Sequence, residues 1–154
     1  MFDFIHVQFE EEYAHAAILF KEYADWLHID LSFQHFDEEL TALKRMYAAP
    51  QGTIILCKKE KMHIACVAVR PINAEIAELK RMYVKSDYQH NGIGQTLLKK
   101  SIKFAKEAGY QKIRLDTLNT MIPAMNLYEK NGFNKIPAYY NNPEPTAVYF
   151  EKQL

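Results

Sequence analysis

Two glycines stand close together where a strand-like stretch gives way to a helical pattern, in the segment Gln89-His90-Asn91-Gly92-Ile93-Gly94. Glycine permits unusual backbone torsions and lets a ligand approach the chain closely. A helix N-terminus adds unpaired N–H groups and the positive end of the helix dipole. Together these features predict a cradle for a pyrophosphate group. Two common phosphate motifs do not fit, because no Gly-Lys-Ser/Thr follows and Leu97 stands where a dinucleotide fingerprint has its third glycine.

The sequence on either side of this loop predicts the elements that position it. Residues 75–84 alternate in the manner of a strand, and residues 92–108 have the apolar spacing of an amphipathic helix that stops at Gly109. Strict alternation along the strand places two sets of side chains on opposite faces: Glu78, Lys80, Met82 and Val84 on one, and Leu79, Arg81 and Tyr83 on the other.

The remaining stretches complete an α/β pattern. The expected strands cover residues 4–9, 53–58, 63–70, 75–84, 112–118, 133–136 and 146–152. The expected helices cover residues 11–28, 37–47, 92–108 and 123–131, and Asp37 is the expected N-cap of the second. The order β-α-α-β-β-β-α-β-α-β-β predicts one domain over residues 1–154, with a mixed sheet and helices on its faces.

Length, charge and cysteine use argue against several classes of protein. A chain of 154 residues suits one domain, and Lys+Arg and Asp+Glu both number 19, so the basic excess of a nucleic-acid binder is missing. No apolar run reaches membrane-spanning length and the first residues lack a cationic leader, so a cytoplasmic protein without membrane association is expected. Cys57 and Cys66 stand in apolar runs without CxxC spacing, which predicts buried thiols and no metal site.

A second motif, Ala124-Met125-Asn126-Leu127-Tyr128-Glu129-Lys130-Asn131-Gly132-Phe133, makes the pattern more specific. With it, the sequence resembles the GNAT superfamily of N-acetyltransferases. The spacing Gln89-x-x-Gly92-x-Gly94 matches that family's Gln/Arg-x-x-Gly-x-Gly/Ala pattern, and the second motif follows at the expected distance. Weaker similarity over residues 78–84 and the N-terminal helices extends the resemblance to essentially the whole chain.

The resemblance implies both a fold and a reaction. The fold would be α/β (α+β) of the GNAT type: a central mixed, mostly antiparallel sheet flanked by helices, in which splayed strands form the cofactor cleft. The protein would transfer an acetyl group from acetyl-coenzyme A, its cosubstrate, to a primary amine of a small molecule or peptide by direct attack, without a metal. The alternative is a module that binds or senses acetyl-coenzyme A without turnover. The acceptor, the acyl-chain length and the choice between monomer and homodimer stay open.

The resemblance also carries the family's cofactor contacts onto this sequence. The pantetheine arm would pair with backbone groups of Met82, Tyr83 and Val84, and Lys130 could reach the phosphates. The pyrophosphate would lie on a cradle made by the amides of Gln89, His90, Asn91, Gly92, Ile93 and Gly94, with Gln95 and Thr96 beside it.

One position departs from the family pattern. Many members carry asparagine three residues before the alanine matched by Ala124, and this sequence has Met121 there. Asn119, two residues earlier, either replaces the missing hydrogen bond to the pantetheine or is a simple turn residue.

Acetyl transfer needs a neutral amine, and the thiolate that leaves is helped by a proton donor. Tyr128 matches the tyrosine that many family members use as this donor; the alternative is that it only packs its helix against the cofactor. Glu78, eleven residues before Gln89, stands at the spacing where some histone acetyltransferases of the superfamily place their base. The alternative for Glu78 is an ion pair with Lys80. His63 and His90 are less favoured as bases.

Overall fold

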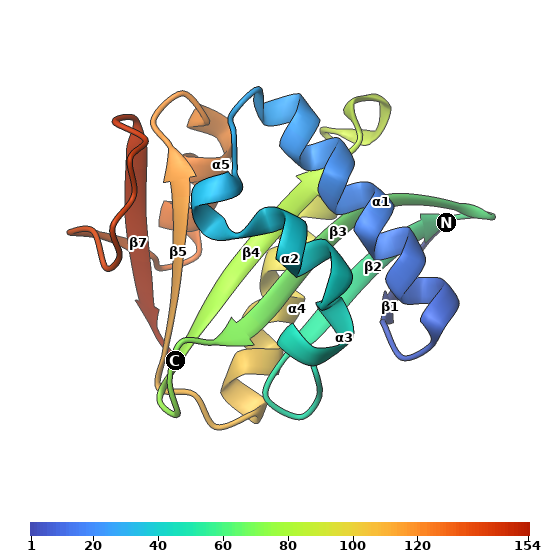
Figure 1. The fold of residues 1–154 in the computed structure, drawn as a ribbon, viewed down its shortest axis with the longest axis horizontal. Coiled ribbons are helices and arrows are strands. Elements are labelled where there is room, and N and C mark those ends of the chain that lie inside the picture. The colour runs from blue at the N-terminus through green and yellow to red at the C-terminus, as the bar shows by residue number, and fades with distance from the viewer.

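The strand-forming stretches pair into one seven-stranded sheet in the order β1-β2-β3-β4-β5-β7-β6 (Figure 1). The computed structural model describes residues 1–154, apart from the side chain of Phe33. The strands are β1 (Phe2–His6), β2 (Thr53–Lys59), β3 (Met62–Pro71), β4 (Ile76–Val84), β5 (Lys112–Leu118), β6 (Asn134–Ile136) and β7 (Ala147–Gln153). Neighbouring strands run antiparallel except β4 and β5, which are parallel. The expected mixed, mostly antiparallel sheet is confirmed.

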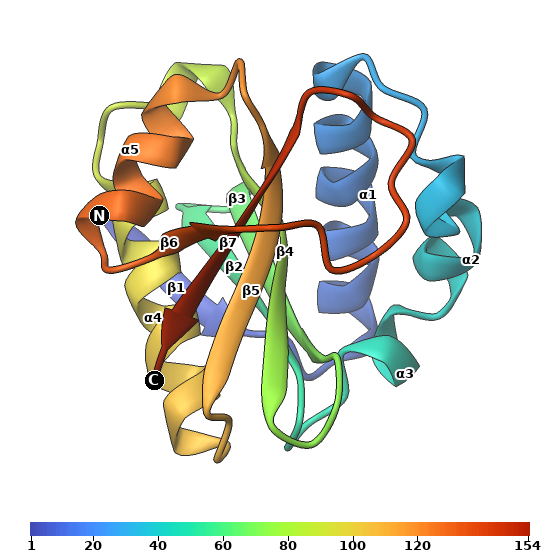
Figure 2. The same ribbon diagram turned by 90° about the vertical axis from the view of Figure 1, so that its left-hand side faces the viewer.

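Helices cover both faces of this sheet. They are α1 (Glu10–Leu27), α2 (Phe36–Thr41), α3 (Leu43–Met46), α4 (Ile93–Glu107) and α5 (Ile122–Lys130), with short 3₁₀ helices η1 (Ser32–Gln34) and η2 (Ser86–Tyr88). Figure 2 shows α1, α2 and α3 on one side of the sheet and α4 and α5 on the other. Among the described residues, no helix is both long enough and apolar enough to cross a membrane.

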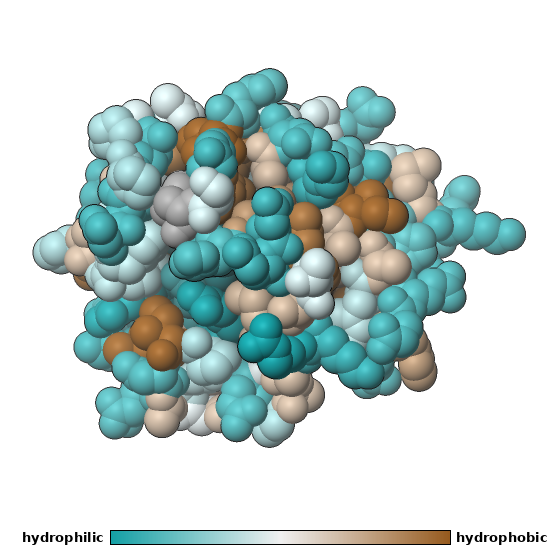
Figure 3. Space-filling view, viewed as in Figure 1, coloured by the Kyte–Doolittle hydropathy of each residue, from teal (hydrophilic) through white to brown (hydrophobic). Residues whose placement is uncertain are grey.

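Each face of the sheet has its own core. The core under α4 and α5 contains Leu97, Leu98, Ile113 and Phe150, and the core under α1 to α3 contains Leu19, Phe20, Tyr47 and Leu56. Cys57 belongs to the first core and Cys66 to the second, and both are buried free thiols, as expected. Hydrophilic residues cover most of the face that carries α1 and α2, where apolar residues form separate small patches (Figure 3).

The second expected helix is wrong in two respects. Residues 37–47 form two short helices, because α2 ends at Thr41, whose hydroxyl donates to the Glu38 carbonyl oxygen at 2.9 Å, and Ala42 leaves helical torsions. The N-cap is His35, in the left-handed region with φ 57°, and the expected cap Asp37 lies inside the first turn. Sequence reasoning missed this start because histidine is not among the usual N-cap residues.

The strand before the glycine loop also departs from strict alternation. Leu79 and Lys80 pair opposite Val69 and Ala68, but Tyr83 pairs opposite Cys66, so β4 holds one residue more than β3. This β-bulge includes Arg81, whose φ of 59° is uncommon for a residue with a side chain. Beyond the bulge, the side chains of β4 that were expected on one face of the sheet lie on the other. Met82 and Val84 therefore pack with Leu79 on the α4 side, and Tyr83 belongs to the core under α1.

A buried ion pair holds this bulge. The Arg81 guanidinium donates to both carboxylate oxygens of Glu39 on α2, at 3.0 and 2.9 Å, and to Oε1 of Gln34 at 2.8 Å. The Tyr47 hydroxyl donates to Oε2 of Glu39 at 3.0 Å. Burial opposes ionisation of Glu39, but the hydrogen bonds and charge of Arg81 outweigh it and hold the pKa of Glu39 below its usual value. The pair therefore ties α2 to the middle of β4.

Replacing Glu39 by glutamine should destabilise the fold strongly, because it leaves the Arg81 charge buried without a partner. We expect a loss of about 3–5 kcal/mol in the free energy of unfolding at neutral pH. Since the folded-state pKa of Glu39 is lowered, the stability it contributes is present above its unfolded pKa of 4.5 and is lost as pH falls through the folded value. The difference in the free energy of unfolding between Glu39→Gln and the wild type should therefore become smaller in acid.

Chemical denaturation of both proteins across pH measures this difference. Glu38→Gln is the matched control, because Glu38 is the exposed neighbour on the same helix. An equal effect of the two substitutions, or a Glu39→Gln effect independent of pH, would contradict the role of the pair.

Candidate active site

A cleft opens where β4 and β5 part. The two strands pair only from Ile76 opposite Lys112 to Glu78 opposite Arg114. Beyond these three positions β4 continues to Val84 and β5 to Leu118, and the structure records no further pairing between them. The splay implied by the resemblance is confirmed. The cleft between the strands is walled by β4, β5, α1, α5 and the loop that precedes β7, and its lining includes Lys80, Met82, Asp116, Leu118, Ala124 and Tyr128.

The glycine loop lies at the end of β4 and leads into α4. Gly92 caps the helix with φ 76°, so its left-handed torsion needs glycine. Side-chain amides shape the loop, since Nδ2 of Asn91 donates to the Tyr88 carbonyl oxygen at 3.0 Å. Within the described part of the chain, the amides of Ile93, Gly94 and Gln95 have no hydrogen-bond acceptor. The first turn of α4 therefore presents free donors of the kind that bind a phosphate.

The space around the two glycines fits a bulky anion. A Cβ atom built on Gly92 would meet no heavy atom within 4 Å, so open space lies beside the loop. A Cβ atom on Gly94 would meet only Cδ2 of Leu127, at 3.7 Å, which is ordinary contact. Free donors and open space together fit the pyrophosphate group predicted from the sequence.

The other residues predicted to bind the cofactor lie around this loop and cleft. Met82, Tyr83 and Val84 end β4, on the stretch that β5 no longer pairs. The Gln89 side chain donates to the Val84 carbonyl oxygen at 3.1 Å and so ties the loop to the strand. His90 is exposed, with φ 69°. These positions agree with the predicted cofactor path without testing it.

Four polar residues predicted to bind the cofactor flank this path. Oε1 of Gln95 accepts a hydrogen bond from the Asn131 side chain at 3.0 Å, which joins α4 to α5. The Thr96 hydroxyl donates to the Gly92 carbonyl oxygen at 3.1 Å. Asn119 is exposed in the turn after β5, and its backbone amide donates to the Thr146 carbonyl oxygen at 2.8 Å. Lys130 is exposed at the end of α5.

The predicted proton donor, Tyr128, lies in the wall of the cleft. Its ring is buried on α5 and packs against Phe133 and Phe150, with ring centroids 5.8 Å away in each case. Its hydroxyl has no hydrogen-bond partner among the described residues, although Tyr128 lines the cleft. Burial raises the pKa of this phenol, so it stays protonated at neutral pH. The packing role and the donor role are therefore compatible.

The predicted base, Glu78, lies outside this cleft, in a neighbouring hollow. Its Oε1 accepts from Nε of Arg70 at 2.9 Å and its Oε2 accepts from the Tyr139 hydroxyl at 2.6 Å. The alternative for Glu78, an ion pair with Lys80, is wrong, because Glu78 pairs with Arg70 from β3. The hollow measures about 310 Å³, and its walls include Gln34, His35, Arg70, Glu78, Lys80 and Tyr139.

Sequence reasoning missed a second carboxylate, Asp116 on β5. It lines the same cleft as Tyr128, is half-buried, and accepts a hydrogen bond from the Tyr140 hydroxyl at 2.6 Å. The structure records no ion pair to it, and burial raises the pKa of its carboxyl group. The signal that could have identified it is an acidic residue on a strand whose other charged residues, Lys112 and Arg114, are basic.

Solved structures identify the class of protein to which this fold belongs. An acetyltransferase of the GNAT family from Staphylococcus aureus superposes with a TM-score of 0.81 at 20% identity, over 99% of both chains. The PaiA N-acetyltransferase of Thermoplasma acidophilum, solved in complex with coenzyme A, superposes with a TM-score of 0.77 at 20% identity, over 100% of this chain and 99% of that one. The fold is thus that of the acetyltransferases.

Sequence comparison assigns the family. Residues 20–133 match the Acetyltransferase (GNAT) family. An uncharacterized N-acetyltransferase of Schizosaccharomyces pombe is 35% identical over 139 residues, which are 89% of this chain and 85% of that protein. The chain belongs to the GNAT family and is an acyltransferase, as the two sequence motifs predicted.

Proposed function

We propose that the protein transfers an acetyl group from acetyl-coenzyme A to the primary amine of a small molecule or peptide. The observation that carries this proposal is the parting of β4 from β5, in a fold where β4 leads through the glycine loop to free amide donors at the start of α4. An unpaired stretch of β4 offers backbone groups to an amide-bearing arm, and the amides of Ile93, Gly94 and Gln95 offer donors to its pyrophosphate. Acetyl-coenzyme A would supply the thioester.

Two side chains in the cleft can move the protons of the reaction. As the amine nitrogen forms its bond to the acetyl carbon and the carbon–sulfur bond breaks, the nitrogen must lose a proton and the sulfur must gain one. Tyr128 holds a proton on an unpartnered hydroxyl, which makes it the donor. The residues fit turnover better than simple binding, because a sensing module has no need of a proton donor in the cleft.

Two carboxylates are candidates for the base, and they differ in their surroundings. Glu78 has both oxygens occupied by Arg70 and Tyr139, and Arg70 neutralises its charge. In the described part of the chain Asp116 has no ion-pair partner, and burial raises its pKa above that of an ordinary aspartate, so its carboxylate accepts a proton more readily than an exposed one does. Asp116 also lines the cleft that contains Tyr128. We therefore favour Asp116 and keep Glu78 as the second candidate.

Removing the Tyr128 hydroxyl should slow turnover and leave cofactor binding in place. Tyr128→Phe keeps the ring that packs against Phe133 and Phe150. Release of free thiol from acetyl-coenzyme A, followed with a panel of primary amines, should occur with the wild type and fall roughly tenfold to a thousandfold in the variant. Calorimetry should show similar acetyl-coenzyme A affinity for both proteins. Unchanged turnover, with chemistry limiting the rate, would return Tyr128 to a packing role.

Asp116→Asn should lose activity and gain stability. Without a carboxylate to take the proton, turnover at neutral pH should fall roughly a hundredfold or more and recover partly at higher pH, where more free amine exists. The raised folded-state pKa means that ionisation of Asp116 disfavours the folded state, so wild-type stability falls as pH rises from the unfolded value of 3.8 through the folded one. The melting temperature of the variant should exceed that of the wild type at neutral pH, and the two should converge in acid.

Glu78→Gln is the comparison variant for this measurement. It leaves the half-buried Arg70 without its ion-pair partner, so its melting temperature should fall. Overlapping pH–rate profiles for Asp116→Asn and the wild type, with loss and alkaline recovery in Glu78→Gln instead, would transfer the base role to Glu78.

A further inference from the structure

The cleft carries opposite charges on its two walls at the point where the strands part. Lys80 follows the paired Glu78 by two positions on β4, and Asp116 follows the paired Arg114 by two positions on β5. Because side chains alternate along a strand, both lie on the face that is covered by α1 and α2. Both line the same cleft. A cation and an anion therefore stand across the opening from each other, each on its own strand.

The Lys80 ammonium has no partner in the part of the chain that the structure describes. The two arginines around it are each matched: Arg70 pairs with Glu78 at 2.9 Å, and Arg81 pairs with Glu39 at 2.9 Å. Among the described residues, no ion pair or side-chain hydrogen bond involves Lys80, although it is half-buried. Burial and the nearby Arg81 lower the pKa of Lys80 to about 8. A half-buried ammonium without a counter-charge is costly, and an anion bound in the cleft would supply that charge.

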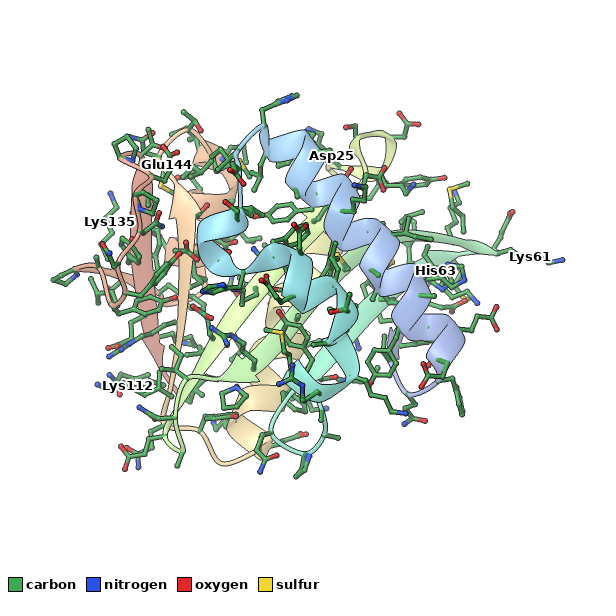
Figure 4. The ribbon with its side chains drawn as sticks, in the orientation of Figure 1. Asp25, Lys61, His63, Lys112, Lys135 and Glu144 are labelled. Carbon is green, nitrogen blue, oxygen red and sulfur yellow. The ribbon has the colours of Figure 1, made fainter. Side chains whose placement is uncertain are left out.

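The opposite wall is anionic. Asp116 accepts a hydrogen bond from Tyr140 and forms no ion pair with any residue that the structure describes. Glu144, from the loop before β7, also lines the cleft, and its Oε1 accepts from the Thr146 hydroxyl at 2.7 Å. Figure 4 places Glu144 near the end of β5 opposite to that of Lys112, where the cleft opens. This wall suits an ammonium group, which must reach the cleft before it loses its proton.

We propose that the acceptor is a zwitterion, an amine that also carries a carboxylate, as an amino acid does. Its amine would lie on the Asp116 wall and its carboxylate would bind the Lys80 ammonium. The inference rests on the proposed function and adds the class of its acceptor. One unpaired ammonium matches one singly charged carboxylate, and the paired arginines around it disfavour a polyamine, whose second charge would approach cations.

The neighbouring hollow gives the acceptor room beyond its charged groups. Lys80 and Gln34 line both the cleft and the hollow of about 310 Å³, so the two spaces meet at the proposed carboxylate site. The far walls of the hollow are formed by Tyr139, Tyr140 and His35. Aromatic and polar walls of this kind accept side chains of several shapes. The carboxylate would therefore position the acceptor at Lys80, and the hollow would accept amino acids with different side chains.

Pairs of amines that differ only in the carboxylate test the proposal. Thiol release would be measured with leucine and 3-methylbutylamine, phenylalanine and phenethylamine, and with spermidine as a polyamine. The wild type should use each amino acid with a kcat/KM roughly tenfold to a hundredfold above that of its carboxylate-free partner, the effect of one charge-assisted contact. Lys80→Met should close this gap mainly by raising KM for the amino acid, and Lys80→Arg should keep much of it.

Lys135→Met is the matched control, because Lys135 is exposed on the edge strand β6, at the outer side of the sheet (Figure 4). It should keep the wild-type preference, and melting curves should show that all variants fold. Equal use of both members of each pair, preference for spermidine, or equal losses for both members in Lys80→Met would overturn the proposal while the proposed function stood. Absence of thiol release with every amine would contradict the proposed function, and this proposal with it.

Discussion

The guanidinium of Arg81 is buried between β4 and α2, and a buried charge is tolerated only with a partner. Glu39 supplies that partner from α2, and Gln34 and Tyr47 complete the hydrogen bonds. The pair fixes the bulge that shifts the alternation of β4, so Met82 and Val84 turn to the α4 side just before the glycine loop. It also anchors the segment of η1 and α2, from which Gln34 lines the cleft. The ion pair between Arg81 and Glu39 thus determines the conformation of β4 before the glycine loop and the position of η1 and α2.

The need of a buried charge for a partner also divides the other charged residues around the cleft into paired and unpaired groups. Arg70 pairs with Glu78 and Arg81 pairs with Glu39, whereas Lys80, Asp116 and Glu144 line the cleft without an ion-pair partner among the described residues. Paired charges have little left to offer a substrate, whereas unpaired ones can bind or exchange a proton with it. This distribution is one reason why we propose that the chemistry takes place in the cleft and not around the paired Arg81.

Local sequence patterns predicted most of the helices and strands, but they failed where contacts between distant residues determine the local conformation. Residues 112–118 were predicted as a strand with the observed bounds, and the helix after the glycine loop was predicted from Gly92, Gly109 and the apolar stripe of α4. The bulge at Arg81 was not predictable in this way, because it depends on Glu39, 42 residues away in the chain. The partner of Glu78 lies on another strand for the same reason. Asp116 was overlooked because a motif-based reading gave no role to the strand between the two motifs.

The central claim, that acetyl-coenzyme A lies on the loop at the start of α4, is tested most directly by calorimetric titration of acetyl-coenzyme A into Gly94→Glu. The chain has room for a Cβ atom there, since Leu127 is 3.7 Å away, so the variant should fold while its carboxylate repels the pyrophosphate. Gln153→Glu adds the same charge at an exposed position on β7 and serves as the control. The account requires that Gly94→Glu lose measurable binding while Gln153→Glu binds as the wild type does. Near-normal affinity in a folded Gly94→Glu protein would contradict it.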